Sequence, residues 1–293
     1  MNVGVLGAGT MGHGIAQVAA VAGHDVTLRD VDEQLVEDGI ASIRDHLDGG
    51  VERGKVTEAD REATLDRLAG TTDLAEAVGD AALVIEAVPE DTELKQEVLS
   101  EVESLAPADA VLATNTSSLS VTEIAGALDR PGRVVGLHFF NPVHIMALVE
   151  VVVAEQTDEA TREFAESFVE EVGKTAVTVT DSPGFATSRL GVAVGVEAVR
   201  MVQEGVASPR DIDAAMELGY NHPMGPLELG DVVGLDVRLD ILEHLREELG
   251  ERFRPPHLLR RKVRAGKLGK KTGEGFYVWE DGDIVGVSGE SDD

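Results

Sequence analysis

The sequence predicts an α/β protein: a doubly wound, mainly parallel sheet comes first, and an all-helical C-terminal domain follows. Short apolar runs alternate with amphipathic stretches as far as Asp181. A glycine-rich turn joins the first run to the first amphipathic stretch, and beyond DSPGF the periodicity is helical only. Because Pro183 and Gly184 interrupt the sheet pattern, we predict one domain over residues 1–182 and a second over residues 183–293.

The composition predicts a globular, cytoplasmic chain. Its 293 residues are 43% hydrophobic, which is enough for one large core or two ordinary ones. No stretch approaches the run of about 18 apolar residues that spans a membrane, and MNVGVLGAG shows no secretory signal. The chain has no Cys, which excludes disulfides and thiolate metal sites.

The charge balance is strongly acidic. With 55 Asp and Glu against 25 Lys and Arg, the formal net charge is −30, so we expect neither nucleic acid nor membrane partners. The acidic residues are spread along the chain, and only 7 of the basic residues are Lys. Such a surface suits concentrated salt, where the Debye length falls to roughly 3 Å at 1 M. An ordinary acidic cytosolic protein is the alternative, but the size of the charge favours a halophilic one.

The first turn has the pattern of a dinucleotide-binding site. VGVL predicts a short strand, GAGTMG has the spacing G-x-G-x-x-G, and residues 11–22 predict a helix. Gly7 permits a tight turn, Gly9 lets the backbone approach a pyrophosphate, and Gly12 lets the helix pack closely on the strand. The motif lies between a strand and a helix, so the sequence predicts a Rossmann-type domain.

An acidic residue at the end of the second strand favours NAD over NADP. Asp30 follows Gly7 by 23 residues, where a carboxylate accepts hydrogen bonds from a ribose 2′-hydroxyl and repels a 2′-phosphate. Arg29 is discordant, because an arginine could meet that phosphate. The cofactor-binding residues predicted in this region are Gly7, Gly9, Thr10, Met11, Gly12 and Asp30.

Further βα units follow. Helices are predicted over residues 33–53, 58–69, about 92–105 and 158–172, and strands within AALVIEAVPED, AVLATNTSSLS, RVVGLHFFNP, ALVEVVVA and AVTVT. Ligands of such sheets bind beyond the carboxyl ends of the strands. Glu86–Glu90, Asn115–Ser117 and His138 occupy such ends, so we expect them to converge on one crevice. Taken singly, they also fit turn and cap chemistry, and Ser117 or Ser120 could begin a short helix.

The stretch HFFNPVHIMALVEVV places an imidazole and a carboxylate on neighbouring strands. His138 can accept a proton near neutral pH, and Glu150 can orient the ring and stabilise its cation if residues 134–140 and 147–153 pair. This arrangement favours removal of a hydroxyl proton while hydride leaves the same carbon for NAD. The alternative is a structural histidine and an edge-strand charge.

The sequence resembles the L-3-hydroxyacyl-CoA dehydrogenase family, including 3-hydroxybutyryl-CoA dehydrogenases. The resemblance covers nearly the whole chain through GAGTMGHGIAQV, EAVPED, NTSSLSVTEIA, GLHFFNPVHIMALVEVV, DSPGF, HPMGPLEL, DVVGLD and GKKTGEGFY. It implies NAD-dependent, reversible oxidation of a 3-hydroxyacyl-CoA, as in the β-oxidation of fatty acids. It also implies roles for single residues: catalysis by His138 and Glu150, hydroxyl binding by Ser117, substrate binding by Asn141, and NAD contacts by Glu90, Lys95 and Asn115.

One position departs from the family pattern. After PGF the family usually carries an Asn immediately before Arg, and this chain has Ser188 there. Serine offers one donor and a shorter reach, so we expect Ser188 to contact the substrate more weakly or through water. The CoA phosphates need basic partners, for which Arg53 and Lys55 are candidates, although solvated helix-end charges explain both equally well.

The second half is predicted to be helical. Residues 185–205 form an apolar helix, Ser208 and Pro209 start another, two more lie within GPLELGDVVGLDVRLDILEHLREELG, and PPHLLRRKVRAG is a basic one. The family resemblance implies a homodimer through this domain. No His, Asp and Glu cluster has metal-ligand spacing, so we expect no metal.

Two other functions remain open at this level. A dehydrogenase of the same fold could act on a free hydroxy acid or sugar acid, as in the lambda-crystallin and gulonate dehydrogenase branch, but Phe139 and Phe140 favour an acyl chain. A catalytically silent NAD-binding protein is disfavoured by the presence of both His138 and Glu150.

Overall fold

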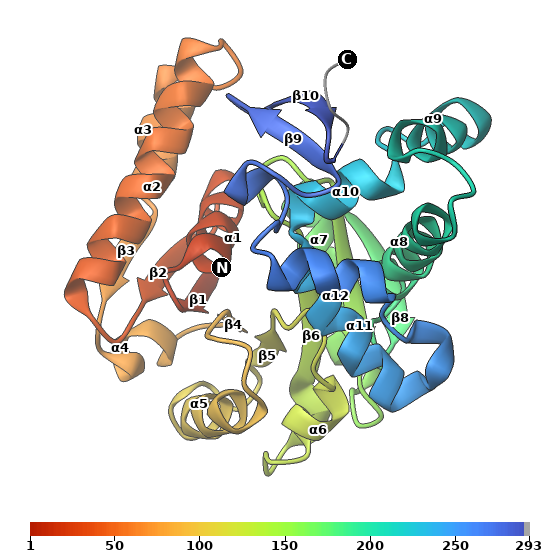
Figure 1. Ribbon diagram of the computed structural model, residues 1–293. Helices are drawn as coiled ribbons and strands as arrows, with labels where there is room; N and C mark the ends of the chain where they lie inside the picture. Colours follow the sequence, from red (N-terminus) through yellow and green to blue (C-terminus); the bar gives the residue numbers. More distant parts are fainter. Residues whose placement is uncertain (290–293) are drawn as a thin grey trace. The chain divides into compact units, whose positions relative to one another are not determined.

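The structure is a computed structural model that describes residues 1–289 of the 293. The chain forms two compact units, which divide between Phe185 and Ala186 (Figure 1). The sequence placed the domain boundary between residues 182 and 183. Each unit has its own core and is described separately below.

The first unit is built on an eight-stranded sheet with the strand order β3-β2-β1-β4-β5-β6-β7-β8. The strands are β1 Asn2–Leu6, β2 Asp25–Arg29, β3 Leu68–Thr71, β4 Leu83–Glu86, β5 Val111–Thr114, β6 Val134–Phe139, β7 Leu148–Val153 and β8 Thr175–Thr180. Strands β1 to β6 pair in parallel, β7 pairs antiparallel with β6, and β8 is parallel to β7. The predicted doubly wound, mainly parallel sheet is confirmed. Its order reverses between β1 and β4, which is where ligands of such sheets bind.

Helices cover both faces of this sheet. They are α1 Thr10–Val21, α2 Glu33–Glu52, α3 Glu58–Leu65, α4 Leu74–Val78, α5 Thr92–Leu105, α6 Val121–Ala125 and α7 Glu159–Glu171. Successive side chains of a strand point to opposite faces. Val5 therefore packs with α1, α2 and α7, whereas Leu6 packs with α4, α5 and α6. Two apolar cores result, one on each side of the sheet.

Side-chain caps define where several of these helices begin. Carboxylates or hydroxyls of Asp32, Thr57, Asp73, Asp91 and Ser120 accept hydrogen bonds from backbone N–H groups in the first turns of α2 to α6. Such caps are worth about 1 kcal/mol each. Of the two serines considered as caps, Ser120 has this role.

The predicted helix over residues 58–69 is wrong at its end. Helix α3 stops at Leu65, and residues 68–71 form edge strand β3, which pairs with β2. The sequence LAGT has no strand alternation of its own. A Cβ at Gly70 would lie 2.5 Å from a methyl carbon of Val36, so the glycine lets α2 pack on this strand. Strand pairing with β2 and packing against α2 therefore determine the conformation of residues 68–71.

The predicted helices 33–53, 92–105 and 158–172 are confirmed as α2, α5 and α7.

The second unit is helical as predicted. Its helices are α8 Thr187–Glu204, α9 Pro209–Tyr220, α10 Pro226–Val233, α11 Leu235–Leu249 and α12 His257–Arg264. Ser208 caps α9 as expected, by accepting a hydrogen bond from the Asp211 N–H. Apolar side chains of α8 and α11, such as Val196 and Leu242, form a core separate from those of the sheet.

The second unit is not all-helical, because a two-stranded antiparallel hairpin ends its described part. Strands β9 Tyr277–Glu280 and β10 Asp283–Val287 pair with each other. Buried Asp231 on α10 anchors this hairpin: its carboxylate accepts from Phe276 N at 2.8 Å, Tyr277 N at 2.9 Å and Trp279 Nε1 at 3.0 Å. Because this anchor lies 45 or more residues away in sequence, local periodicity did not indicate the hairpin and predicted only helices for this domain.

Among the described residues, no helix combines the length and the apolar character needed to span a bilayer.

Candidate active site

The turn after β1 requires glycine at two positions. Gly7 has φ +98°, and a Cβ there would lie 2.6 Å from the carbonyl oxygen of Ala87. A Cβ at Gly12 would lie only 1.6 Å from the carbonyl oxygen of Gly7. Any side chain at either position would therefore push the loop, helix α1 and the end of β4 apart, as the sequence predicted for a tight turn and close packing.

Packing within the protein does not explain the third glycine. A Cβ at Gly9 would meet no atom within 4 Å. Gly9 is also the N-cap of α1, and no side chain caps this helix. The bare backbone and the positive end of the helix dipole together form a place that suits a phosphate group. Thr10 and Met11 open the helix and flank this place.

Asp30 holds the same loop from the end of β2. One carboxylate oxygen accepts from Ala8 N and the other from Val31 N, each at 2.7 Å. The carboxylate is thus fixed beside the glycine-rich turn, where a ribose 2′-hydroxyl would meet it. The discordant Arg29 is engaged elsewhere, because its Nε donates to the carbonyl oxygen of Thr72 at 3.2 Å.

His138 and Glu150 meet across β6 and β7. They are register partners in the antiparallel pair, and Nδ1 lies 2.8 Å from Oε2 of the carboxylate. The imidazole is 6% exposed and the carboxylate is fully buried. Because an ionised carboxylate only accepts hydrogen bonds, the ring proton lies on Nδ1 and Nε2 keeps its lone pair. The arrangement therefore presents a proton acceptor whose cation has a partner.

Aromatic rings surround this imidazole. The ring centroid of Phe140 lies 4.3 Å from that of His138, and that of Phe185 lies 5.7 Å away. One residue after the histidine, Phe139 N donates to Oδ1 of Asn115 at 2.9 Å. This bond ties the end of β5 to the end of β6. Asn141 lies in the exposed turn that follows.

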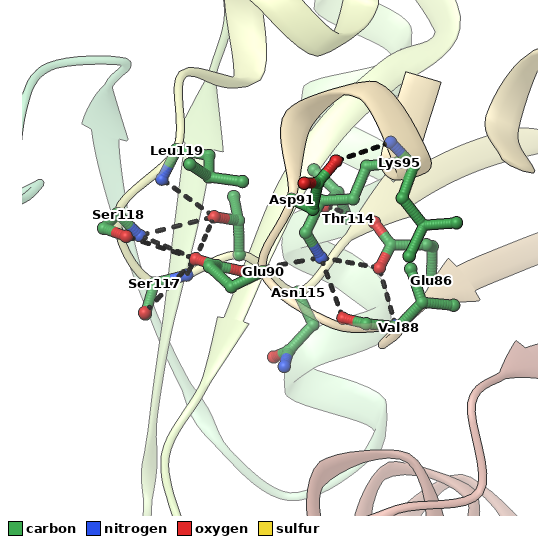
Figure 2. Close-up of polar contacts among 12 residues, drawn as sticks. Glu86, Val88, Glu90, Asp91, Lys95, Thr114, Asn115, Ser117, Ser118 and Leu119 are labelled. Atoms are coloured by element: carbon green, nitrogen blue, oxygen red, sulfur yellow. Dashed lines mark hydrogen bonds and ion pairs between the residues drawn. The ribbon is translucent and has the colours of Figure 1, made fainter. Parts of the chain in front are cut away.

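The turn after β5 is held by Glu90. One of its carboxylate oxygens accepts from the Thr116 hydroxyl at 2.6 Å, from Ser117 N at 2.9 Å and from Ser118 N at 3.2 Å (Figure 2). The exposed hydroxyl of Ser117 lies 3.4 Å from the same oxygen. Burial raises the pKa of Glu90, but the Thr116 hydroxyl and the Lys95 ammonium outweigh it and lower this pKa below its usual range.

Lys95 is buried beneath this turn. Its ammonium, 1% exposed, donates to Glu86 Oε1 at 2.7 Å and to the carbonyl oxygen of Val88 at 3.3 Å. It also lies 3.4 Å from Glu90 Oε2 (Figure 2). The second oxygen of Glu86 accepts from the hydroxyl of Thr114 at 2.7 Å. The NAD contact expected of Lys95 stays a prediction.

Two family models cover almost the whole chain. The NAD-binding domain of 3-hydroxyacyl-CoA dehydrogenase matches residues 2–182, and the C-terminal domain of 3-hydroxyacyl-CoA dehydrogenase matches residues 184–279. This chain belongs to the 3-hydroxyacyl-CoA dehydrogenase family.

Similar proteins carry related names. A probable 3-hydroxybutyryl-CoA dehydrogenase of Bacillus subtilis is 46% identical over 278 residues, which cover 94% of this chain and 96% of the relative. The 3-hydroxybutyryl-CoA dehydrogenase of Mycobacterium tuberculosis is 46% identical over 281 residues, 95% of this chain and 98% of the relative. The crystal structure of (S)-3-hydroxybutyryl-CoA dehydrogenase from Ralstonia eutropha superposes with a TM-score of 0.92 at 41% identity and covers 96% of this chain and 99% of its own.

As a member of the 3-hydroxyacyl-CoA dehydrogenase family, the chain is an NAD-dependent oxidoreductase that acts on 3-hydroxyacyl-CoA. The residues present fit NAD. Gly7 and Gly12 are required by packing within the protein, whereas a side chain at Gly9 would meet no protein atom, so the absence of one there leaves room for a pyrophosphate. The fixed carboxylate of Asp30 lies at the same turn.

A basic cavity of about 640 Å³ lies beside α2. The basic side chains on its wall are His46, Arg53, Lys55, His144 and Lys174, and the described residues that line it include no Asp or Glu. The Lys174 ammonium donates to the carbonyl oxygens of Val143 and Met146 at 2.6 Å each, which fixes the turn between β6 and β7. In a chain of net charge −30, this local excess of positive charge marks a place for an anion.

Two imidazoles on the wall of this cavity, His46 and His144, lie close together, and a third, His13, lies next to His46. The ring centroids of His46 and His144 are 4.5 Å apart, and those of His46 and His13 are 5.6 Å apart. Burial, followed by the neighbouring His46, lowers the pKa of both His13 and His144. Within residues 1–289, no group of three or more His, Asp or Glu side chains is arranged to hold a metal ion.

The remaining predicted substrate residue lies in the second unit. Ser188 is half-buried in the first turn of α8, and its contact with substrate stays a prediction. Sequence reasoning missed the pairing of Glu86 with Lys95 and the part of Thr114 in it. A signal was present, because an acidic residue inside the apolar run ALVIEAV and one of only 7 Lys indicate a buried ion pair.

Proposed function

We propose that His138 is the general acid–base catalyst of this dehydrogenase and that Glu150 orients it. The observation that carries the proposal is the 2.8 Å contact between Nδ1 and the buried carboxylate. The contact leaves Nε2 as the nitrogen that exchanges a proton with the substrate. It also stabilises the imidazolium that forms, which would otherwise be a costly charge in a nearly buried position.

The proposed reaction converts an L-3-hydroxyacyl-CoA into the 3-oxoacyl-CoA. Nε2 of His138 takes the proton of the 3-hydroxyl group, the C3–H bond breaks with its electron pair, and the C3–O bond becomes a carbonyl. NAD, when bound, supplies the hydride acceptor. In the reverse direction the imidazolium returns the proton to the oxygen.

Ser117 is proposed to hold the substrate oxygen during this transfer. Its hydroxyl is exposed, whereas its backbone N–H is fixed by Glu90. A hydroxyl donor suits an oxygen that alternates between alcohol and carbonyl. Asn141 and Ser188 are proposed as further polar contacts to the thioester side of the substrate. The rings of Phe140 and Phe185 give the imidazole an apolar surrounding that suits an acyl chain.

The basic cavity is proposed to take the phosphates of CoA. Arg53 and Lys55 bring positive charge to its wall, which phosphates require, and the neutral imidazole of His144 beside them can donate a hydrogen bond. Replacing Arg53 with Ala should raise KM for acetoacetyl-CoA about 10-fold and leave KM for acetoacetyl-N-acetylcysteamine, which has no phosphates, unchanged. Arg44→Ala is the matched control, because Arg44 is exposed on α2, the helix that Arg53 caps, and does not line the cavity. An equal effect on both thioesters would contradict this assignment.

The experiment that tests the whole proposal is NADH oxidation with 3-oxoacyl-CoA thioesters of short, medium and long chains. Acetoacetyl-CoA should be reduced, with NADPH a much poorer donor than NADH. Activity confined to free oxo acids or sugar acids would favour the other branch of the fold. Tight NADH binding without turnover on any substrate would indicate a silent NAD-binding protein.

Assembly, location and salt tolerance belong to the same proposal. The second unit exposes large apolar side chains at Leu190, Val206, Leu218 and Tyr220, at 67%, 60%, 87% and 76%. Such exposure supports a homodimer through the helical unit, which light scattering of wild type and Leu218→Asp would test.

The absence of Cys fits the cytoplasm, and the net charge of −30 supports a halophilic enzyme. Oxidation of 3-hydroxyacyl-CoA would place it in the β-oxidation of fatty acids.

A further inference from the structure

A fully buried carboxylate lies on the same side of the sheet as the proposed catalytic pair. Glu86 ends β4 and pairs in register with Thr114 of β5, which in turn pairs with Gly136 of β6. Two residues further along β6 comes His138. Because side chains alternate along a strand, Glu86, Thr114 and His138 all face the α5 and α6 side.

Both oxygens of Glu86 are used. One accepts from Lys95 Nζ at 2.7 Å and from Val88 N at 2.8 Å, and the other accepts from the Thr114 hydroxyl at 2.7 Å (Figure 2). The three N–H donors of Lys95 in turn have three oxygen partners, on Glu86, Val88 and Glu90. The ammonium is therefore saturated and buried within the protein.

Stability alone is a poor reason for this arrangement. Taking both charges of an ion pair out of water carries a large desolvation penalty, and well-packed apolar residues often serve stability as well or better. What the pair supplies is geometry: Glu86 and Lys95 hold the N–H and the C=O of Val88 from both sides. The loop that leads to Glu90 is thereby fixed.

The same network reaches the proposed substrate contact. The Lys95 ammonium forms an ion pair with one carboxylate oxygen of Glu90. The other oxygen accepts hydrogen bonds from the backbone N–H groups of Ser117 and Ser118. Glu86 holds Thr114, at the start of the same turn, through its hydroxyl. The turn that carries Ser117 is therefore fixed at both ends by one set of charges.

We propose that Glu86 and Lys95 are positioning residues for the dehydrogenase reaction, because their buried ion pair fixes Glu90 and, through it, the turn that carries Ser117. The inference rests on the proposed role of Ser117 in holding the substrate oxygen. It assigns Lys95 a role that needs no contact with NAD.

Three variants of the full-length protein test this inference: Glu86→Gln, Lys95→Met and the double variant. Steady-state kinetics with acetoacetyl-CoA are measured beside NADH binding by fluorescence and thermal unfolding. Each single variant should lower kcat by about 10- to 100-fold, as a displacement of about 1 Å does, and should change Kd for NADH by a clearly smaller factor. The double variant should be no slower than the slower single variant, because both residues act through one link.

Other outcomes overturn the inference. A weaker NADH affinity with unchanged kcat would make Lys95 a cofactor contact. A lower unfolding temperature with unchanged kcat per NADH-binding molecule would make the pair merely structural. A single variant can fail to fold, because it leaves a buried charge unpaired. The double variant removes both charges, so its kcat then tests the inference by itself. A normal kcat in the double variant would overturn the inference.

Two further variants separate this inference from the function on which it rests. Ser117→Ala should itself lower kcat; if it does not, the proposed role of Ser117 fails and this inference fails with it. If Ser117→Ala is slow and the double variant is not, only the inference is wrong. Glu97→Gln makes the same chemical change as Glu86→Gln on the exposed face of α5 and should leave kcat unchanged.

Discussion

His138 and Glu150 are cross-strand neighbours on β6 and β7, with the imidazole Nδ1 2.8 Å from a fully buried carboxylate oxygen. The antiparallel register of the two strands sets this pair. Because β7 follows β6 after a short turn, the pairing depends on few residues. The relationship gives the imidazole a defined tautomer and its cation a partner.

The first prediction concerns the imidazole. His138→Gln should lower kcat by about 10²- to 10⁴-fold, because an amide cannot exchange the proton, and should leave Kd for NADH within about 2-fold. Stopped-flow kinetics and NADH fluorescence measure the two quantities. His222→Gln, in an exposed turn of the second unit, is the matched control and should resemble wild type. Loss of NADH binding together with turnover would contradict the assignment.

The second prediction concerns the carboxylate. Glu150→Gln keeps the shape of the side chain but removes the charge, so the imidazolium loses its partner and the ring loses its preferred tautomer. We expect kcat to fall by at least about 100-fold. Rates are expressed per NADH-binding molecule, because an unpaired buried group also destabilises the fold. A normal kcat in the folded variant would show that Glu150 has a structural role and does not assist His138.

The third prediction compares two glycines of one turn. Gly12→Ala should unfold or strongly destabilise the first unit, because its Cβ would lie 1.6 Å from a backbone oxygen. Gly9→Ala should leave the unfolding temperature unchanged, because its Cβ would meet nothing, and yet weaken NADH binding by about 10-fold or more. Calorimetry and fluorescence titration check both. A normal NADH affinity in Gly9→Ala would contradict the binding of a phosphate group at this turn.

The fourth prediction concerns pH and the second unit. Burial raises the pKa of Asp231 above its usual value, although the N–H donors of Phe276, Trp279 and Tyr277 oppose this shift. Between the unfolded and the folded pKa, the native state binds more protons than the unfolded state, so this contribution to stability falls as pH rises. The Asp231→Asn variant lacks this contribution. The difference in unfolding free energy between wild type and Asp231→Asn should therefore be larger near pH 4 than near pH 7. Urea unfolding at both pH values measures it, and a cost that grows with pH would contradict the sign.

The fifth prediction concerns salt. With a net charge of −30, the unfolding temperature and the activity should rise from about 0.1 M to about 1 M KCl, where the Debye length falls to roughly 3 Å. Glu93, Glu97 and Glu101 form an exposed row at four-residue spacing on α5, which repels itself by about 0.2–0.5 kcal/mol per pair. A variant with Gln at all three positions should depend less on salt. A wild type indifferent to salt would rule out the halophilic interpretation.

Much of the site followed from local pattern. The spacing of Gly7, Gly9 and Gly12, with Asp30 after the next strand, reflects a turn whose requirements are steric and lie within one βα unit. The pairing of His138 with Glu150 could be predicted because a hairpin-like connection limits the register of adjacent strands. The second unit's helices followed from periodicity and from caps such as Ser208.

Other features depended on partners far away in sequence. Residues 68–71 became a strand because β2 offered an edge and α2 a surface, not because of their own pattern. The hairpin of β9 and β10 depends on Asp231 of α10. The buried carboxylate of Glu86 accepts a hydrogen bond from the hydroxyl of Thr114, which lies 28 residues away on β5.

The sequence by itself determined the class of sheet, the glycine-rich turn and the pairing of His138 with Glu150, because steric limits on glycine and the two-residue period of strands act over short distances. Only the tertiary structure decided which polar side chains lose contact with water. The burial of Glu86 beside Thr114 of β5 and the collection of Arg53, His144 and Lys174 around one cavity depend on segments separated by many residues. Dehydration and charge pairing are properties of such assembled neighbourhoods, and no single segment carries them.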